Sequence, residues 1–226
     1  DPEYIVYTDE HWDRLKCLRN QAVPLLKALA AYNATGAVFG SVARGDVTET
    51  SDLDIYVQEM IPTFTIDLAL RIANFEIIGK EISMATPSSV IKALYYLGNE
   101  ITISVRLTEY TSSQAQFYKF GGQIKLEDII NERRVPGVSK ALLIIEPTED
   151  GHKAYSLIGH EYEARELLGI DEKMIAERIR VLTKRDKFGR TGVFLKKMFD
   201  PEESFEESLK TLANTNSLIR RRMNFK

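Results

Sequence analysis

The sequence predicts an α+β protein: a small mixed β-sheet packed with helices, followed by a mainly helical C-terminal part. In some segments apolar residues recur every three or four positions, as in helices; in others they alternate with polar residues, as in half-buried strands. In the first half the two kinds of segment are interleaved. Hydrophobic residues make up 44% of the 226 and charged residues 28%, which is typical of a folded chain and excludes a mainly disordered one.

The first half predicts helices and strands in mixed order. Pro24 is expected to kink or divide the first helix, and Pro87 is expected to open the third. The predicted segments are a helix at 9–32, strands at 37–39 and 52–57, a helix at 65–74, a strand at 81–85, a helix at 87–97 and a strand at 101–107.

The second half begins near Thr111, where a polar stretch and then Gly121-Gly122 change the character of the chain. We therefore expect two domains, residues 1–110 and residues 111–226. The predicted segments are a short helix at 126–133, a hairpin of strands 141–145 and 154–158, helices at 161–168 and 171–184, a strand at 193–195 and a charged helical tail from 201.

The net charge of −3 is an average over two unlike halves. Residues 1–110 contain 9 basic and 15 acidic residues, a net charge of −6, whereas residues 111–226 contain 21 basic and 18 acidic residues, a net charge of +3. Eight basic residues and one acidic residue fall within 178–197. The total therefore argues neither for nor against a nucleic-acid partner, and the second half mildly favours one.

Nothing in the sequence predicts a membrane or secreted protein. No apolar run approaches the ~18 residues of a membrane helix, and no signal-peptide pattern is visible. The single cysteine, Cys17, has no intramolecular disulfide partner and is expected to be a buried structural thiol. We therefore expect a cytoplasmic protein. The three histidines lack the spacing of a zinc site.

The stretch from Gly40 to Asp54 carries the chemistry. Gly40 ends a strand and allows a tight turn that a ligand can approach closely. Ser41 offers a hydroxyl group and a backbone amide at the start of a helix, where an anion is favoured. Asp52 and Asp54 are two apart on a strand, so their carboxylates share one face, and Mg²⁺ suits such a pair. The combination predicts a phosphate cradle beside a magnesium site, as nucleotidyl transfer requires.

Each half of this pattern also has an ordinary structural explanation. Gly-Ser turns are common, and Asp-x-Asp at a strand end can be a solvated edge. Their combination, in strand–turn–helix–strand order with Arg44-Gly45 between them, favours nucleotide chemistry over two coincidental features.

Residues 10–105 resemble the DNA polymerase beta nucleotidyltransferase superfamily, and most closely its minimal members. The shared residues are Gly40-Ser41, Arg44-Gly45 and Ser51-Asp52-Leu53-Asp54. The resemblance implies that Gly40, Ser41, Arg44 and Ser51 bind the nucleotide. It also implies that Asp52 and Asp54 are catalytic and bind one or two Mg²⁺ ions. The implied reaction moves an NMP group from an NTP, with ATP expected, to a hydroxyl acceptor that a nucleic acid could carry.

The third carboxylate of that family is missing from its expected place. Aligning Thr86-Pro87 with the family pattern puts Ser83 at this position, and serine is no general base at neutral pH without help. Glu81, two residues earlier on the same face, is either a replacement or a solvated charge. Transfer activity therefore stays open at this point.

The basic segment of the second half suggests a winged helix-turn-helix. Residues 161–184 read as two helices around Gly169, and residues 188–195 could form the wing as a glycine-turned hairpin. The first candidate contacts to DNA or RNA are Lys173, Arg178, Arg185 and Arg190. An alternative function is therefore a DNA-binding regulator, or an antitoxin-like protein, with a degenerate nucleotidyltransferase domain. An oligomer is compatible with each reading.

Overall fold

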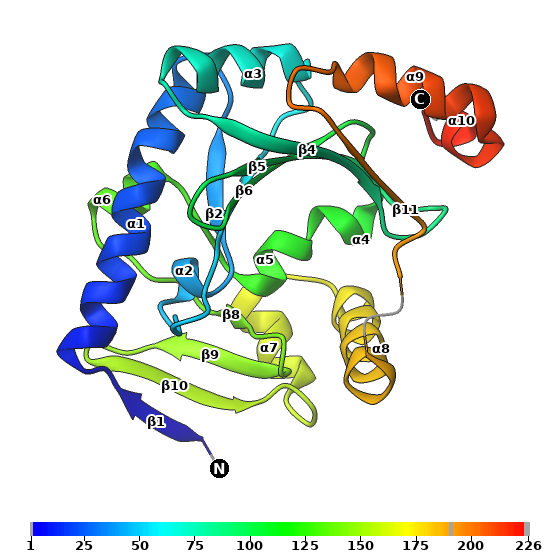
Figure 1. Ribbon diagram of the computed structural model, residues 1–226. Helices are drawn as coiled ribbons and strands as arrows, with labels where there is room; N and C mark the ends of the chain where they lie inside the picture. Colours follow the sequence, from blue (N-terminus) through cyan, green and yellow to red (C-terminus); the bar gives the residue numbers. More distant parts are fainter. Residues whose placement is uncertain (1, 190–191, 224–226) are drawn as a thin grey trace. The chain divides into compact units, whose positions relative to one another are not determined.

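The computed structural model describes residues 2–189 and 192–223 and confirms an α+β protein with mixed sheets and flanking helices (Figure 1). Within the described part, no helix is both long and apolar enough to cross a membrane. The chain divides into two compact units, each assembled from three segments. The first unit comprises residues 1–23, 38–53 and 112–191; the second comprises residues 24–37, 54–111 and 192–226. The division into domains 1–110 and 111–226 stays a prediction.

The first unit contains a sheet in the order β1-β10-β9-β8, with antiparallel neighbours. The hairpin predicted around residues 147–151 is confirmed as β9 (Leu143–Pro147) and β10 (Gly151–Ser156). The other elements are β1 (Glu3–Val6), α2 (Ser41–Arg44), α4 (Ser112–Ala115), α5 (Phe117–Gly121), β7 (Gln123–Ile124), α6 (Leu126–Ile130), β8 (Gly137–Val138), α7 (Glu161–Leu168) and α8 (Glu172–Phe188).

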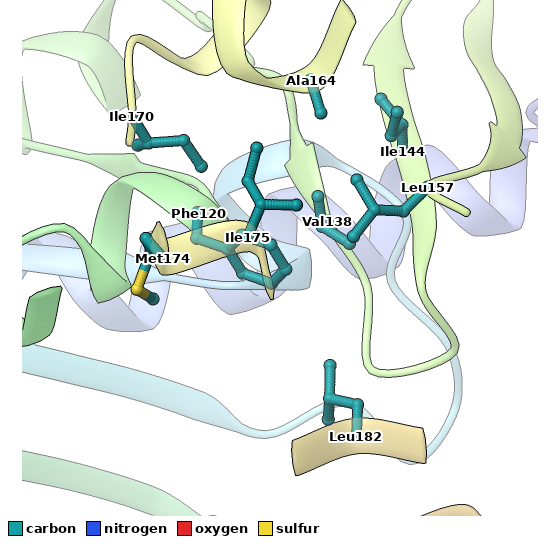
Figure 2. Close-up of a cluster of buried hydrophobic side chains, with 9 residues drawn as sticks. All are labelled: Phe120, Val138, Ile144, Leu157, Ala164, Ile170, Met174, Ile175 and Leu182. Atoms are coloured by element: carbon teal, nitrogen blue, oxygen red, sulfur yellow. The ribbon is translucent and has the colours of Figure 1, made fainter. Parts of the chain in front are cut away.

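The core of the first unit is an apolar cluster between the helix pair α7–α8 and the hairpin (Figure 2). α7 ends at Gly169, whose φ of 59° is a left-handed helix end that favours glycine, and α8 begins after Asp171. The helix pair predicted at 161–168 and 171–184 is therefore confirmed. The cluster consists of Phe120, Val138, Ile144, Leu157, Ala164, Ile170, Met174, Ile175 and Leu182.

The second unit is built on strands in the order β11-β4-β5-β6-β3-β2. The strands are β2 (Gly36–Phe39), β3 (Leu53–Val57), β4 (Ile77–Met84), β5 (Ile91–Leu97), β6 (Ile101–Arg106) and β11 (Leu195–Phe199). The last two residues of β2 belong to the first unit, where they pair with β7. The helices are α3 (Thr63–Ile72), α9 (Phe205–Thr215) and α10 (Ser217–Met223), together with the end of α1 (Asp9–Ala30).

Helix α1 confirms the predicted apolar stripe but corrects two details. The spacing predicts a stripe of Trp12, Leu15, Ala22, Leu26 and Leu29. All of these are buried except Trp12, which is half-buried. The helix continues through Pro24 instead of dividing there. Cys17 is exposed, so the expected buried thiol is wrong.

The helix predicted at 87–97 is wrong, because this segment forms strand β5. Pro87 lies in a turn instead, in which the Ser89 backbone N–H donates to the Thr86 carbonyl oxygen at 3.0 Å. Burial then alternates strictly along Ile91–Leu97. The aromatic and β-branched side chains of this segment favour strands, and a partner strand on each side outweighs the weak helical spacing.

The predicted wing at 188–195 is not formed in the described part of that segment, which excludes residues 190–191. α8 continues to Phe188, and the next described strand is β11. β11 pairs antiparallel with β4 and completes that edge of the sheet in the second unit (Figure 1). An open edge leaves backbone N–H and C=O groups unpaired, so pairing with β4 satisfies more of them than an isolated wing.

Candidate active site

The turn after β2 has the backbone that a close ligand approach requires. Gly40 has a φ of 85°, in the region that favours glycine, and a Cβ atom there would meet nothing within 4 Å. The glycine is therefore needed for its backbone angle and leaves open space beside the turn. Gly45, with a φ of 105°, ends α2 and donates its N–H to the Ser41 carbonyl oxygen at 2.6 Å.

α2 is a single turn, and this changes the reason for expecting an anion here. With only four residues it sums few peptide dipoles, so the helix dipole adds little. The Ser41 hydroxyl and the first amides of the turn, which have no acceptor within it, are the groups that could bind phosphate. Ser41 Oγ lies 3.3 Å from Ser51 Oγ. Ser51 Oγ accepts a hydrogen bond from the Thr48 N–H at 2.8 Å, so Ser51 positions the loop before β3.

Arg44 lies inside the first unit and holds the turn in place. Its Nε and Nη2 donate to the two carboxylate oxygens of Asp46 at 2.9 and 2.8 Å, and its Nη1 donates to the Gly121 carbonyl oxygen at 2.6 Å. The side chains of Arg44 and Asp46 are 7% and 14% exposed. These contacts favour a structural role. Nucleotide binding by Arg44 stays a prediction that its contacts do not support.

Two side chains of α1, which sequence reasoning missed, also fix this turn. Arg19 donates from Nε and Nη2 to the Val42 carbonyl oxygen at 3.1 and 3.0 Å. Burial lowers the pKa of Arg19 to about 10, against the effect of nearby carboxylates. His11 donates from Nε2 to the Gly45 carbonyl oxygen at 2.7 Å. The sequence shows only that these polar residues lie on a predicted helix. It does not show that they donate hydrogen bonds to backbone carbonyl groups more than 20 residues away.

Asp52 and Asp54 stand at the start of β3, as the sequence predicts. Asp52 is exposed and immediately precedes the strand, whereas Asp54 is half-buried as its second residue. Leu53 and Ile55 are buried, which confirms that they point into the core. This alternation fixes Asp54 on the opposite face of β3 from Leu53 and Ile55.

The two carboxylates fit a particular kind of metal site. Among the residues that the structure describes, no three His, Cys, Asp or Glu side chains gather as a metal-binding group. Mg²⁺ in nucleotide sites is usually held by one or two carboxylates together with substrate phosphates and waters. Asp52 and Asp54 therefore fit an ion that arrives with a nucleotide, whose phosphates and waters would supply the remaining ligands.

The strand order argues against Glu81 as the third carboxylate. β5 and β6 stand between β4, which carries Glu81, and β3. With strands about 4.8 Å apart, β4 lies about 14 Å from β3. Glu81 is also buried and has partners: Tyr96 donates its hydroxyl to Glu81 Oε2 at 2.8 Å, and Lys196 Nζ lies 3.6 Å from the same oxygen.

The strand beside β3 is β6, and its polar positions hold no carboxylate. Burial alternates along β6, so Thr102, Ser104 and Arg106 lie on one face, opposite Ile103 and Val105. Lys92 of β5 is paired with Arg106 across the strands. Sequence reasoning missed Lys92 because it took residues 87–97 for a helix, and it missed Arg106 because the pairing of β6 with β5 is not visible in the sequence.

Residues 21–83 match the family model of the nucleotidyltransferase domain. The matched range contains the Gly40-Ser41 turn, both aspartates and Ser83, and it supports the nucleotidyltransferase superfamily for this segment. No curated protein and no solved structure matches the chain. The nucleotidyltransferase segment is thus identified by its family model, and residues 84–226 lie outside the match.

The four candidate nucleic-acid contacts, of which Lys173, Arg178 and Arg185 lie on α8, fall into three groups. Lys173 and Arg185 are exposed. Arg178 instead packs its guanidinium over the rings of Phe117 and Phe120, at 4.9 and 5.9 Å from the ring centroids, and burial lowers its pKa. Arg190 lies outside the described residues.

Proposed function

We propose that this chain is a Mg²⁺-dependent nucleotidyltransferase that moves an NMP group from an NTP, with ATP expected, to a hydroxyl acceptor. The observation that carries the proposal is the pair Asp52 and Asp54 at the start of β3, within the segment that matches the nucleotidyltransferase domain. The Gly40-Ser41 turn of the same segment supplies the hydroxyl and amide groups for the phosphates.

In this reaction, different residues would bind the triphosphate and the magnesium ion. The Ser41 hydroxyl and neighbouring amides bind the triphosphate, and Ser51 keeps Ser41 in place. Asp52 and Asp54 hold the magnesium ion, which neutralises charge on the phosphates when bound. The acceptor oxygen forms a bond to the α-phosphorus, the bond to the bridging oxygen breaks, and pyrophosphate leaves. The hydroxyl proton passes to solvent water.

The test is incorporation of α-labelled ATP in the presence of Mg²⁺ and a pool of hydroxyl acceptors. We expect activity in the wild type and its loss in the Asp52→Asn/Asp54→Asn variant. Asp13→Asn, which changes an exposed carboxylate on α1, is the matched control and keeps activity. Equal incorporation by the wild type and the Asp52/Asp54 variant would reject the assignment.

A second candidate function is nucleotide binding without transfer, in a regulator or antitoxin-like protein. It is favoured by β6, whose polar positions beside β3 are Thr102, Ser104 and Arg106 and include no carboxylate. Calorimetry with ATP and Mg²⁺, combined with a pyrophosphate-release assay, separates the candidates. Binding without release across all acceptors supports the second function, and co-purification of a partner protein supports its antitoxin form.

Nucleic-acid binding through α8 is the remaining part of the proposal. Its exposed cations at positions 173, 180, 184 and 187 recur at helical spacing and form one stripe, and Arg185 is exposed on another side of the helix. In a gel-shift assay with DNA and RNA we expect binding that weakens steeply with salt. Replacing Lys173 and Arg185 with Gln should weaken nucleic-acid binding. Replacing Arg178 with Gln should instead destabilise the fold, because its guanidinium packs over the Phe117 ring. Binding that is insensitive to salt would contradict this role.

A further inference from the structure

Helix α3 carries apolar side chains on two opposite faces. Ile66 and Leu70 are fully buried in the second unit. Phe64, Leu68 and Ile72 are instead 65, 44 and 61% exposed, and they recur every four residues. Residues four apart lie above one another on a helix, so these three side chains form one continuous apolar surface. We call Phe64, Leu68 and Ile72 the α3 stripe.

The α3 stripe is unusual for a surface that faces only water. A helix that packs on one side normally presents polar and charged residues on the other. Single exposed apolar side chains are common on protein surfaces and need no explanation. Among the helices in the described part of the chain, however, only α3 has three large exposed apolar residues; each of the others has at most two. A continuous apolar stripe indicates a face that a partner covers.

No segment of this sequence is available to cover the α3 stripe. The exposed fractions show that the described residues leave it open. The other residues fall in runs of one, two and three, at positions 1, 190–191 and 224–226. Three extended residues span at most about 10 Å, whereas the eight-residue interval from Phe64 to Ile72 spans about 12 Å along the helix. The partner is therefore a separate chain.

The α3 stripe is complementary to its own copy about a twofold axis. Leu68 lies at the centre, with Phe64 four residues before it and Ile72 four residues after it. When two copies of α3 meet in antiparallel orientation, Leu68 faces Leu68 of the second copy. Phe64 then faces Ile72 at both ends of the contact. Twofold dimers use such interfaces, in which residue i contacts j and j contacts i.

The charged residues beside the α3 stripe fit the same orientation. Asp67 precedes Leu68 by one residue and Arg71 follows it by three, on the same side of the stripe. The twofold axis therefore places Arg71 of one copy and Asp67 of the other about 3 Å apart along the helix. It keeps the two Arg71 residues about 9 Å apart along the same direction. Opposite charges thus approach one another at both ends of the contact.

Both charged residues have partners within their own chain and still face solvent in part. Arg71 pairs with Glu202, and the two side chains are 53 and 75% exposed. Such an exposed pair stabilises a fold little, so it opposes a new contact only weakly. Asp67 pairs with Lys80, and the Asp67 side chain is 20% exposed. Neither pair closes the flank of the α3 stripe to a second copy.

The size of the α3 stripe sets the strength of the association. A standard protein interface covers about 800 Å² of each partner. The ten residues of α3 make a helix about 15 Å long, which offers a smaller contact than this. A small apolar contact supports a weak complex, so we expect association at about micromolar or higher concentrations and not a permanent dimer.

We propose that α3 is a self-association surface, on which two copies of this chain pair their α3 stripes antiparallel about a twofold axis at Leu68. A second copy is the occupant because the spacing of the stripe and the charges beside it complement the same helix in reverse. None of the residues proposed to bind nucleotide or magnesium lies on α3. The association is therefore independent of the proposed function.

Sedimentation velocity of the full chain between about 1 µM and 1 mM measures the association. We expect the average mass of the wild type to rise from one chain toward two over this range. Leu68→Glu places two carboxylates against each other at the axis and should weaken association at least tenfold. Leu167→Glu is the matched control, because it makes the same change at a 38% exposed leucine on α7. It should leave association unchanged, and thermal melting checks that both variants fold.

Cysteine cross-linking tests the antiparallel register and does not depend on Leu68→Glu folding. The background is Cys17→Ser, because Cys17 is exposed. Under mild oxidation, Leu68→Cys should form a disulfide-linked dimer with itself. Phe64→Cys and Ile72→Cys should cross-link when mixed. Phe64→Cys alone should not, because its two copies lie about 12 Å apart along the helix and a disulfide needs Cα atoms within about 7 Å.

Three results would overturn the inference. The first is a wild-type chain that stays monomeric over the whole concentration range, including one that instead co-purifies with a different protein. The second is an equal loss of association in Leu167→Glu. The third is self-linking of Phe64→Cys that is as efficient as its linking to Ile72→Cys, because an antiparallel twofold contact does not allow it. The proposed function fails in a different assay, as unchanged ATP labelling in Asp52→Asn/Asp54→Asn.

Discussion

At the scale of single residues, the motif reading was right about the backbone and incomplete about the side chains. The sequence identifies Gly40 as a turn glycine and Asp54 as a polar residue facing away from the core, because both follow from local geometry. It could not show that Arg44 turns inward to Asp46 and Gly121, since Gly121 is 77 positions away in the chain. Contacts of that range depend on the tertiary fold and leave no local pattern.

The buried pair of Arg44 and Asp46 yields a stability prediction. Asp46→Asn leaves the Arg44 guanidinium without its carboxylate in a position where water can hardly replace it. We expect the free energy of unfolding, measured by urea denaturation, to fall by about 3 kcal/mol. The control is Glu49→Gln, because Glu49 is 88% exposed and lies 3.8 Å from Arg14; it should leave stability unchanged. Equal effects of both variants would contradict a structural role for the pair.

His152 yields a prediction about pH. Burial lowers the pKa of His152, and a 2.7 Å hydrogen bond joins its Nδ1 to the Tyr7 hydroxyl. Below an unfolded histidine pKa of about 6.5, the unfolded chain binds a proton more readily than the folded chain. Stability is therefore fully present above about pH 6.5 and is lost as the pH falls toward the lower folded value.

Urea denaturation at a series of pH values checks this effect. The wild type should lose stability between about pH 7 and pH 5, and His152→Gln should lose less over the same interval because glutamine does not titrate. His160→Gln is the control, since His160 is exposed. Parallel pH profiles for the wild type and His152→Gln would reject the assignment.

At the scale of elements, long periodic segments were predictable and segments that depend on a partner strand were not. α1, β3 and β6 carry a clear helical or alternating pattern, and each was predicted within a few residues. β5 fits a helical spacing at Val90, Ile91, Leu94 and Leu97 as well as a strand pattern. Only pairing with β4 and β6 decides between them, and single-sequence patterns do not contain that pairing.

The link between β4 and α3 yields a prediction at this scale. Lys80 of β4 is fully buried; its Nζ lies 3.0 Å from Asp67 Oδ1 of α3 and donates to the Glu203 carbonyl oxygen at 3.0 Å. Burial raises the pKa of Asp67, and Lys80 opposes that shift. Lys80→Met leaves this carboxylate without its cation, so we expect a loss of about 3 kcal/mol in unfolding free energy.

A double-mutant cycle distinguishes the ion pair from general damage to the core. Replacing both partners, Lys80→Met with Asp67→Leu, should recover about half of the loss, because no uncompensated charge is left buried. Arg71 lies on the same helix as Asp67 and forms an exposed ion pair with Glu202, which lies outside that helix. Arg71→Gln removes this pair and should change the unfolding free energy little. If the double variant is less stable than Lys80→Met alone, the ion pair is not the cause.

At the scale of the whole molecule, the division into domains at residue 110 stays a prediction from composition, and each compact unit combines segments from both sides of that position. Among the described residues, 192–223 pack with 54–111, and 2–23 pack with 112–189. Charge and polarity along the chain cannot reveal that segments distant in sequence pack into the same unit, because this packing depends on the tertiary fold. β11 and α9 are the clearest case, since they complete the unit that contains Asp54.

This arrangement predicts that residues 1–110 do not fold alone. Phe205 of α9 is fully buried, with its ring 4.9 Å from the rings of both Tyr95 and Phe199. Glu206 accepts hydrogen bonds from the Thr63 N–H and hydroxyl at 2.9 Å. The fragment lacks these partners and leaves the β4 edge unpaired, so its circular dichroism should show no cooperative thermal transition.

Two further measurements make this prediction specific to the returning segment. Phe205→Ala in the full chain should cost about 3–4 kcal/mol, because it opens a cavity among Tyr95 and Phe199. Co-expression of residues 1–110 with residues 111–226 should restore a cooperative transition, because the second fragment brings back β11 and α9. A fragment of residues 1–110 that melts cooperatively at the wild-type temperature would instead make the first half a self-sufficient domain, and the C-terminal elements would be dispensable for the site at Asp54.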